Sequence, residues 1–503
     1  METGKNIICN SVINTDGGDF INGDNNFFQK IIINLENKEA RLRSIVEQTK
    51  NVLNKIQTDI SSVQLKRNLA DLSVTELINE NQFIFIDGEA GSGKSAYAKQ
   101  ILESLDNTCI ISFAADQFLK SSLINTLHEI NVDLSIEEIF NEFKEFSNKL
   151  IYIDSFEKLL EGEAEAFREL IAILRKNKDI KLVISCRSYA LEILKFNYFD
   201  KQLLLNNSIV ISVPQLTDDE LNYFVQNIPE LNSIVENVNL LEIVKIPKYL
   251  SLSQKLISIS STDLSHIDII AFKNKLWKNV VGGTNGLLEE KRQNTFINIA
   301  VKRAKNLTLL TSANEFDSEV IYKLKADGIL FEENNLYAPS HDIFEDWGLI
   351  KYINSLRIDN PKIDDFYKAL SNEPAIRRGF RLWVESKIEE SESWIYNFVI
   401  ETINNGSIEN HWKDEVLIAI IKSDLCGKFF TEHKDELLED DLRLLKKIIH
   451  LLKISGKDFN QSPNNKGWDV VIKFLFENIE VLTEMNTLIL RFLYDWENIL
   501  YSG

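Results

Sequence analysis

Residues 83–95 read FIFIDGEAGSGKS, and this stretch decides the fold. A β-branched and aromatic run predicts a buried strand, and the segment from Gly88 to Ser95 then satisfies the phosphate-loop pattern G-x-x-x-x-G-K-[ST]. The glycines let successive backbone N–H groups point at phosphate oxygens at the start of a helix, whose dipole favours anions. We therefore expect Lys94 to reach the β- and γ-phosphates of a nucleotide and the Ser95 hydroxyl to ligate Mg²⁺. A glycine-rich turn that binds nothing is the alternative.

A helical pattern of apolar residues follows the loop from Ala96 to Leu105, so the motif has the strand-loop-helix context that it requires. ATP or ADP with Mg²⁺ is the expected ligand. The residues of this segment that we expect to bind the nucleotide are Gly88, Glu89, Ala90, Gly91, Ser92, Gly93, Lys94, Ser95 and Ala96.

The chain is long and acidic. Its 503 residues predict about three or four domains, and a hydrophobic content of 44% is ordinary for packed cores. Lysine and arginine total 56 against 76 aspartate and glutamate residues, which gives a net charge of −20. This balance argues against a chain-wide surface for nucleic acid or an anionic membrane, although a local basic face remains open. We therefore do not expect nucleic acid as a partner.

The cysteines indicate a reducing compartment. Cys9, Cys109, Cys186 and Cys426 are widely scattered, with no C-x-x-C pair and no secretory leader ahead of them. They are typical of reduced, mostly buried thiols in a cytoplasmic protein. No apolar run reaches the roughly 18 residues that a membrane span needs, so we expect no membrane partner.

The N-terminal segment, residues 1–26, is rich in Asn, Gly and Asp, a composition that suits short strands joined by tight turns. Residues 17–20, GGDF, match a diguanylate cyclase signature, but no α/β domain precedes them and chance is the better interpretation. The segment loosely resembles the β-arch stretches that some signalling NTPases use to recruit a partner; a simple tail is the alternative. Residues 27–75 form an expected helical region, with one long helix predicted over 28–60.

Strands and helices alternate after the loop, as a parallel α/β sheet requires. We expect strands at 109–113, 149–153, 180–185 and 209–213, with helices at 116–130 and 159–176. The second of these strands ends in Asp154, the usual place for the acid that holds the water shell of Mg²⁺ beside the phosphate-loop serine. A polar strand end of no functional meaning is the alternative for Asp154.

Two further charged residues are candidates for catalysis. Glu157 could orient and deprotonate the attacking water, or it could be a solvated acid at a helix start. Arg187 follows the next strand, and we expect it to read the γ-phosphate as a charge-assisted donor. The alternative for Arg187 is a surface arginine that pairs with a carboxylate. Together with Lys94 and Asp154, these residues form the predicted catalytic set.

Beyond Pro214 the pattern is helical. Thr217 with Glu220 predicts a capping box, and the helix over 240–250 is interrupted by Pro247. Further on, residues 320–347 read as a helix, a glycine turn, a short hairpin and another helix, which is a winged-helix pattern. That pattern is architecture and does not establish DNA binding.

At this point the sequence resembles the STAND class of P-loop NTPases, specifically the NACHT-related bacterial proteins that look like antiviral, NLR-type sensors. The resemblance covers roughly residues 61–352. Its motifs, in the family order, are GEAGSGKS (88–95), LIYIDSFEKL (150–159), VISCRS (183–188), VPQLTDDEL (213–221), KIPKYL (245–250) and APSHDIFEDW (338–347).

The resemblance implies roles that spacing alone does not supply. In that family the helical-domain proline packs on the adenine, which here would be Pro247. The winged-helix histidine touches the β-phosphate of ADP in the closed state, which here would be His341; a core histidine is the alternative. The sequence departs from the family at Glu157, because Lys158 follows where many relatives carry a second acid. This departure leaves the water-activating residue open and is compatible with slow hydrolysis.

The last third of the chain, residues 353–503, is nearly all helical in pattern. We expect helices at 363–371, 375–384, 393–403, 416–422, 442–453, 470–476 and 488–494, paired as in an α-solenoid. The final stretch, residues 488–501, is apolar without a polar capping helix after it, so we expect the solenoid to continue.

The expected fold is multidomain α/β plus α. It comprises a P-loop domain (76–213), a helical domain (214–275), a winged-helix domain (276–352) and solenoid-like helices (353–503). We expect a slow ATPase that acts as a switch: a protein trigger on the C-terminal helices opens it, and it forms a homo-oligomer whose N-terminal segments recruit a separate effector, plausibly against phage. The rivals are an AAA-like remodelling ATPase and a nucleotide-stabilised scaffold that does not cycle.

Overall fold

The structure is a computed structural model that describes residues 40–60, 62–65, 67, 72–143, 146–199, 207–260, 264–283, 286–455 and 466–478. The N-terminal segment 1–26, the start of the predicted helix 28–60 and the predicted helix 488–494 lie outside the described residues.

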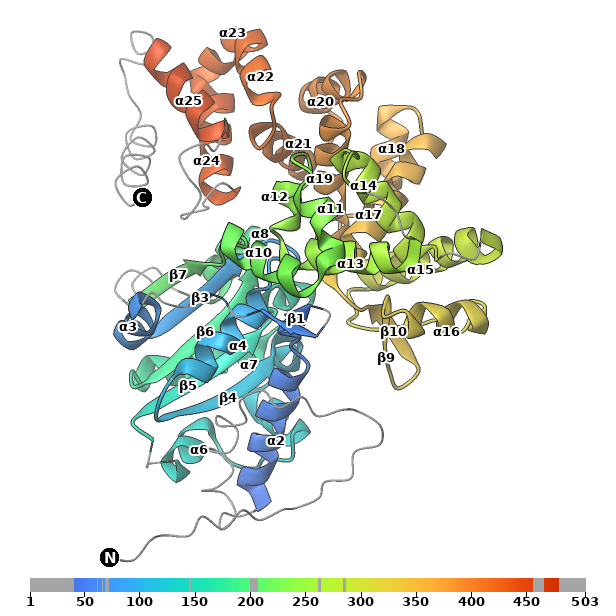
Figure 1. Ribbon diagram of the computed structural model, residues 1–503. Helices are drawn as coiled ribbons and strands as arrows, with labels where there is room; N and C mark the ends of the chain where they lie inside the picture. Colours follow the sequence, from blue (N-terminus) through green and yellow to red (C-terminus); the bar gives the residue numbers. More distant parts are fainter. Residues whose placement is uncertain are drawn as a thin grey trace, which may run out of the picture.

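A five-stranded parallel sheet forms the core of the first half of the chain (Figure 1). Its strands are β3 (Phe83–Gly88), β4 (Thr108–Ala114), β5 (Asn148–Asp154), β6 (Ile180–Arg187) and β7 (Ser208–Ser212), in the order β4-β5-β6-β3-β7. The phosphate-loop strand is buried on both faces, with Phe83 to Ile86 fully inaccessible to solvent. This burial is why the strand reads as a continuous apolar run, and the predicted parallel α/β core is confirmed.

Helices and short turns of helix connect and cover these strands. They are α2 (Ala40–Asn54), α3 (Leu72–Glu80), α4 (Lys94–Ser104), η1 (Ala115–Phe118), α5 (Leu123–Glu129), α6 (Ile136–Glu142), η2 (Phe156–Glu161), α7 (Glu165–Lys176) and α8 (Ser188–Tyr198). A two-stranded hairpin, β1 (Asp59–Ile60) with β2 (Val63–Gln64), follows α2.

Three predicted helices are shorter in the structure. The helix predicted to reach residue 60 ends at Asn54, and the residues near its predicted end form the first strand of the hairpin, which begins at Asp59. The helix predicted over 116–130 is divided into η1 and α5: Ser122 is extended, and the N–H of Leu123 donates to the Glu169 carboxylate at 2.7 Å. The helix predicted from 159 begins only at Glu165, after the 3-10 helix η2 and an extended Gly162.

Helices make up the segment after the sheet. They are α10 (Asp218–Asn227), η3 (Pro229–Leu231), α11 (Asn232–Val235), α12 (Leu241–Val244), α13 (Pro247–Ser260), α14 (Ile269–Leu276), the π-helix η4 (Trp277–Val281) and α15 (Gly286–Asn306). Thr217 caps α10 by accepting the Glu220 N–H at 3.2 Å, as its pattern predicts. Pro247 does not interrupt a helix but begins one, since a first-turn proline lacks only an N–H that would have no partner in the helix.

A small antiparallel sheet follows, with β8 (Thr311–Ser312), β9 (Leu330–Glu333) and β10 (Leu336–Pro339) in the order β8-β10-β9. It is accompanied by α16 (Ser318–Ala326), and the chain then enters the long helix α17 (Asp342–Asp359). This order of helix, hairpin and helix agrees with the pattern read over 320–347.

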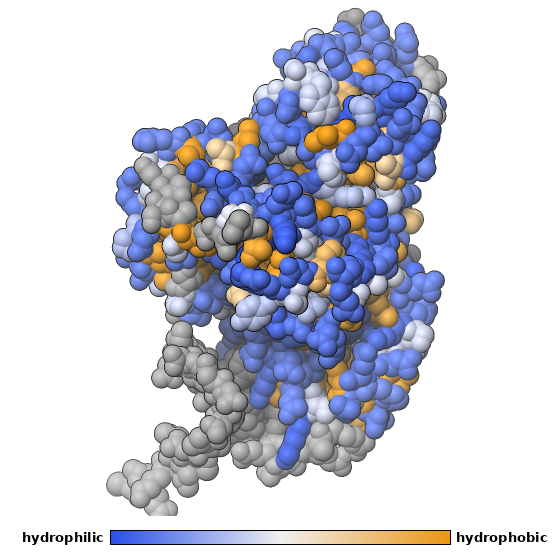
Figure 2. All heavy atoms as spheres, turned by 90° about the vertical axis from the view of Figure 1, so that its right-hand side faces the viewer, coloured by the Kyte–Doolittle hydropathy of each residue, from blue (hydrophilic) through white to orange (hydrophobic). Residues whose placement is uncertain are grey.

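The C-terminal helices share one core and lie above the sheet in Figure 1. They are α18 (Ile363–Ala369), α19 (Pro374–Glu389), α20 (Ile395–Asn404), α21 (Asn410–Ile421), α22 (Cys426–Glu432), α23 (Lys434–Leu438), η5 (Asp440–Leu442), α24 (Arg443–Ser455) and α25 (Lys466–Glu477). The face seen in Figure 2 is mostly hydrophilic, with hydrophobic side chains in small separate groups. No helix among the described residues has the length and hydrophobicity to cross a membrane.

Candidate functional site

The carboxyl ends of three parallel strands bring the predicted residues to one edge of the sheet. Gly88 at the end of β3 pairs in register with Arg187 at the end of β6. Asp154 ends β5, which pairs with the other side of β6. Arg187 therefore lies between the phosphate loop and Asp154, and this edge is where open α/β sheets bind ligands.

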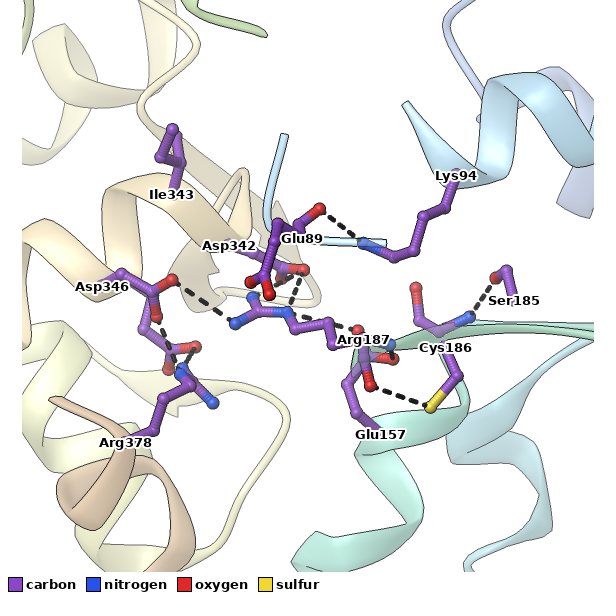
Figure 3. A network of polar contacts seen from close by, with 12 residues as sticks. Glu89, Lys94, Glu157, Ser185, Cys186, Arg187, Asp342, Ile343, Asp346 and Arg378 are labelled. Carbon is purple, nitrogen blue, oxygen red and sulfur yellow. Dashed lines mark hydrogen bonds and ion pairs between the residues drawn. The ribbon is translucent and has the colours of Figure 1, made fainter. Parts of the chain in front are cut away.

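The phosphate loop has the backbone that its glycines predict. Gly91 and Gly93 have φ values of +82° and +87°, a left-handed conformation that residues with a side chain rarely adopt. Lys94 begins α4, and its ammonium donates to the Glu89 carbonyl at 3.0 Å, across the loop (Figure 3). The ammonium of a lysine in this position adds to the backbone N–H donors of the loop, and together such donors suit phosphate oxygens.

Asp154 is held by a set of hydroxyl groups. Its carboxylate accepts hydrogen bonds from Tyr152 at 2.7 Å and from Ser185 at 2.6 Å. Burial and the Asp154 charge raise the pKa of Tyr152 far above its ordinary range, and the Ser95 side chain is a hydrogen-bonding neighbour of the same phenol. Ser95 and Asp154 thus share one polar cluster at the ends of α4 and β5.

These oxygen ligands fit Mg²⁺ bound together with a nucleotide. No group of three His, Cys, Asp or Glu side chains in the described part of the chain could hold a metal by itself. Mg²⁺ in phosphate-loop sites binds through one hydroxyl, waters and substrate phosphates, with an acid in support. Ser95 and Asp154 would hold the ion, which would neutralise charge on the phosphates.

Arg187 is buried, with 4% of its side chain exposed, and it binds carboxylates from two sides. It lies 3.4 Å from Glu157 of η2 and 2.6 Å from Asp342 at the start of α17 (Figure 3). A third carboxylate, Asp346, lies at 3.4 Å, one helical turn further along α17. The arginine therefore joins the sheet to α17. It is buried and not at the surface, but it pairs with carboxylates as the alternative interpretation expects, and its contact with a γ-phosphate stays a prediction.

The carboxylates around Arg187 differ in their electrostatics. Burial raises the pKa of Glu157, and the nearby Asp342 charge adds to this effect. The pKa of Asp342 is far below its usual range, because the combined attraction of Arg187, His341 and Lys94 outweighs the opposing effect of burial. Glu157 also accepts the Arg187 backbone N–H at 3.2 Å, so both of its oxygens are engaged and it is not a solvated helix-start acid.

The start of α13 lies on the phosphate loop. Pro247 is buried, and its Cγ atom lies 3.6 Å from the position that a β-carbon on Gly93 would take. The backbone N–H of Lys248 donates to the Gly91 carbonyl at 3.2 Å. The predicted proline therefore reaches the loop itself, while its contact with adenine stays a prediction.

His341 caps α17 and faces the same site. Its Nδ1 atom accepts the N–H of Ile343 at 3.1 Å, so the neutral ring carries its proton on Nε2. Burial lowers the pKa of His341 to about 3, and the neighbouring Lys248, Arg187 and Lys94 contribute to the decrease. The histidine is thus near the cations of the phosphate loop, and its contact with a β-phosphate stays a prediction.

A second layer of buried ion pairs surrounds this site, and the sequence analysis missed it. Arg378 of α19 binds Asp346 at 2.8 Å and Glu345 at 3.0 Å. Arg303 of α15 binds Glu345 and, at 3.2 Å, Glu161 of η2. The available signal was the pair of acids at 345 and 346 inside a helix rich in aromatic residues, which must find cationic partners when buried.

Comparison with known protein families supports the predicted protein class for the segment that contains the phosphate loop. Residues 67–228 match the model of the family described as novel STAND NTPase 3. Together with the phosphate loop, this match confirms the prediction of a STAND-class P-loop NTPase. No curated protein matches the chain.

Several solved structures resemble the fold distantly. A Walker-type ATPase of Pyrococcus abyssi is 15% identical, with 58% of this chain and 98% of that chain covered and a TM-score of 0.33. A STAND protein with a tetratricopeptide repeat sensor from Pyrococcus horikoshii is 14% identical, with 89% and 69% covered and a TM-score of 0.33. The Aeropyrum pernix ORC2 protein is 11% identical, with 62% and 99% covered and a TM-score of 0.33.

Proposed function

We propose that this chain, whose residues 67–228 match a STAND NTPase family, is a switch controlled by ATP and ADP. The observation that carries the proposal is the bond between Arg187 of the sheet and Asp342 of α17. The arginine that we expect to read a γ-phosphate is bound in this structure by a carboxylate from later in the chain. A nucleotide that competes for Arg187 would weaken the contact between the two domains.

The two nucleotides differ in how they affect this contact. ADP ends at the β-phosphate, which we expect Lys94 and His341 to contact, and it would leave the Arg187–Asp342 pair intact. ATP adds a γ-phosphate whose charge attracts Arg187 and repels Asp342. Such a difference in contacts between two states is what allows a ligand to shift a conformational equilibrium.

Hydrolysis of ATP would return the protein to the ADP state. Lys94 would stabilise the phosphates, and Ser95 with Asp154 would hold Mg²⁺. Glu157 is the candidate base, but both of its oxygens are bound by Arg187 in this structure. Turnover would therefore need Arg187 to move first, which supports a slow ATPase.

In the proposed cycle, residues 214–275 and 276–352 act as helical and winged-helix domains that close on the nucleotide. A protein trigger on the solenoid-like helices of 353–503 would open them, and ATP exchange would permit homo-oligomerisation. The N-terminal segments would then gather and recruit a separate effector, with defence against phage as the plausible setting.

The test is size-exclusion chromatography with light scattering under ADP and under a non-hydrolysable ATP analogue. The wild type should change its assembly size or its hydrodynamic radius between the two nucleotides, and Lys94→Ala should not. Lys99→Ala, in the same helix, is the matched control and should behave as the wild type. An identical size under both nucleotides, with candidate triggers present, would contradict the switch.

A nucleotide-stabilised scaffold is the second candidate, and the engagement of Glu157 by Arg187 favours it. Phosphate release separates the two candidates. A switch that resets should release phosphate at a rate that Lys94→Ala abolishes, whereas a scaffold should show only a trace rate that this substitution leaves unchanged.

A further inference from the structure

Lys248, the second residue of α13, lies against the crown of the phosphate loop. Its backbone N–H donates to the Gly91 carbonyl at 3.2 Å. A β-carbon on Gly91 would come within 2.9 Å of the Lys248 Cβ atom. The side chain therefore leaves α13 directly over the loop, and glycine is needed at position 91 for this approach.

The ammonium group of Lys248 has no carboxylate partner in the part of the chain that the structure describes. Its Nζ atom instead makes a cation–π contact with the ring of Phe344, whose centroid lies 5.4 Å away. Lys245, three residues earlier, is different, because it pairs with Glu242 at 3.0 Å and with Asp218 at 3.4 Å. Among these two lysines, only Lys245 has its charge balanced by an acid.

The surroundings of Lys248 make an anion the suitable partner. Burial lowers its pKa to about 8, and the charge of Lys255 on the same helix adds to the effect. The charge of the Lys248 ammonium also lowers the pKa of His341, as do the charges of Lys94 and Arg187. Three cationic side chains are thus close enough to His341 to lower its pKa.

We propose that Lys248 is a second phosphate-binding lysine, supplied by the helical segment to a nucleoside di- or triphosphate that Lys94 holds from the loop. The inference rests on the proposed nucleotide site and adds a residue that the phosphate-loop motif does not contain. A charged contact from α13 would bind the nucleotide only when α13 lies on the loop, so that nucleotide affinity depends on closure.

A purely structural role for Lys248 is the competing explanation, with its methylene stem packed on Gly91 and its ammonium on Phe344. Methionine keeps most of the stem and removes the charge. Arginine keeps the charge at every accessible pH. These two substitutions therefore separate the packing from the charge.

The experiment measures binding of a fluorescent ADP analogue to the full chain at about pH 7.5. We expect Lys248→Met to weaken binding about tenfold, the loss typical of one charge-assisted contact, and Lys248→Arg to restore most of it. Lys245→Met is the matched control and should bind as the wild type. Unchanged affinity in Lys248→Met, while Lys94→Ala loses binding, would overturn the inference and leave the proposed function standing. Unchanged affinity in Lys94→Ala would instead reject the nucleotide site itself.

A pH series provides a readout that packing would not move. The titratable groups that act on Lys248 are Lys255 of α13 and His341, and the latter stays neutral in this range. Wild-type affinity should fall about tenfold between about pH 7.5 and about pH 9.5, as the free ammonium loses its proton. Lys248→Arg should abolish this decrease, and Lys255→Met should keep it but shift it to higher pH, because the Lys255 charge lowers the pKa of Lys248. A decrease of equal size in Lys248→Arg would contradict the inference.

Discussion

The guanidinium of Arg187 lies 2.6 Å from the carboxylate of Asp342, although the two residues are 155 positions apart in the sequence. One belongs to the central sheet and the other begins a helix beyond the small antiparallel sheet. Their ion pair connects the first half of the chain with the second, and it lies where we expect the γ-phosphate to bind.

Removal of the Asp342 charge should favour ATP. In Asp342→Asn the amide cannot attract Arg187 as a carboxylate does, so the arginine becomes available to the γ-phosphate. We expect the ratio of ATP to ADP affinity to rise about tenfold, the value of one charge-assisted hydrogen bond. Competition binding of the two nucleotides measures it. Asp359→Asn, exposed at the far end of α17, is the control, and an equal effect there would contradict the assignment.

Asp154 should matter for hydrolysis more than for binding. Asp154→Asn keeps the shape of the side chain but loses the charge that supports Mg²⁺. We expect the rate of phosphate release to fall about 10- to 100-fold, as for other residues that support a metal from the second coordination shell. ADP affinity measured with EDTA should be unchanged. A wild-type rate in this variant would reject the role of Asp154.

Arg378 should carry part of the stability between α17 and α19. Arg378→Gln leaves Glu345 and Asp346 short of a buried cation, and breaking a buried pair from one side costs roughly 3 kcal/mol. Thermal unfolding should begin at a clearly lower temperature than in Arg381→Gln, a variant on the same helix α19 that loses the pair with Glu415 of α21. Equal midpoints for the two variants would contradict this prediction.

His341 should make the protein sensitive to acid. Its pKa is about 3 in the folded chain, below the ordinary value near 6.5, so the folded state disfavours the charged ring. Its contribution is complete above about pH 6.5 and is lost as the pH falls, at about 1.4 kcal/mol per pH unit. At pH 5 the loss should be at most about 2 kcal/mol. His341→Gln should flatten the fall in unfolding midpoint between these two pH values, and an unaltered profile would contradict it.

Substitution of Gly91 distinguishes the effect of backbone strain from the effect of a collision with α13. Gly91→Ala places a methyl group 2.9 Å from the Lys248 Cβ atom, whereas Gly328→Ala has the same sign of φ and no atom within 4 Å. Both variants should lose about 1 to 2 kcal/mol from the left-handed backbone. Only Gly91→Ala should also weaken ADP binding, because α13 must move away. Equal ADP affinity in the two variants would show that α13 tolerates the methyl group.

The local parts of this molecule could be predicted from the sequence, and the long-range parts could not. The buried strand before the phosphate loop, the position of Asp154 at a strand end and the Thr217 capping box follow from short patterns. The division of the helix predicted over 116–130 depends on the contact of Leu123 with Glu169, which lies on another helix. Ion pairs such as those of Arg303 and Arg378 depend on tertiary packing, and neither arginine stands in a motif that marks its partner.

The three arginines around α17 would set the time course of the proposed opening. Arg187, Arg303 and Arg378 come from a strand and two different helices, and they hold three carboxylates that are close together on α17. A small displacement of α17 would stretch all of these pairs before water or a phosphate could replace them. Intermediate positions would therefore have the highest free energy, and opening would be a rare event that crosses an activation barrier. Brief encounters with a weak ligand would end before that barrier is crossed, so that the switch would ignore short-lived signals.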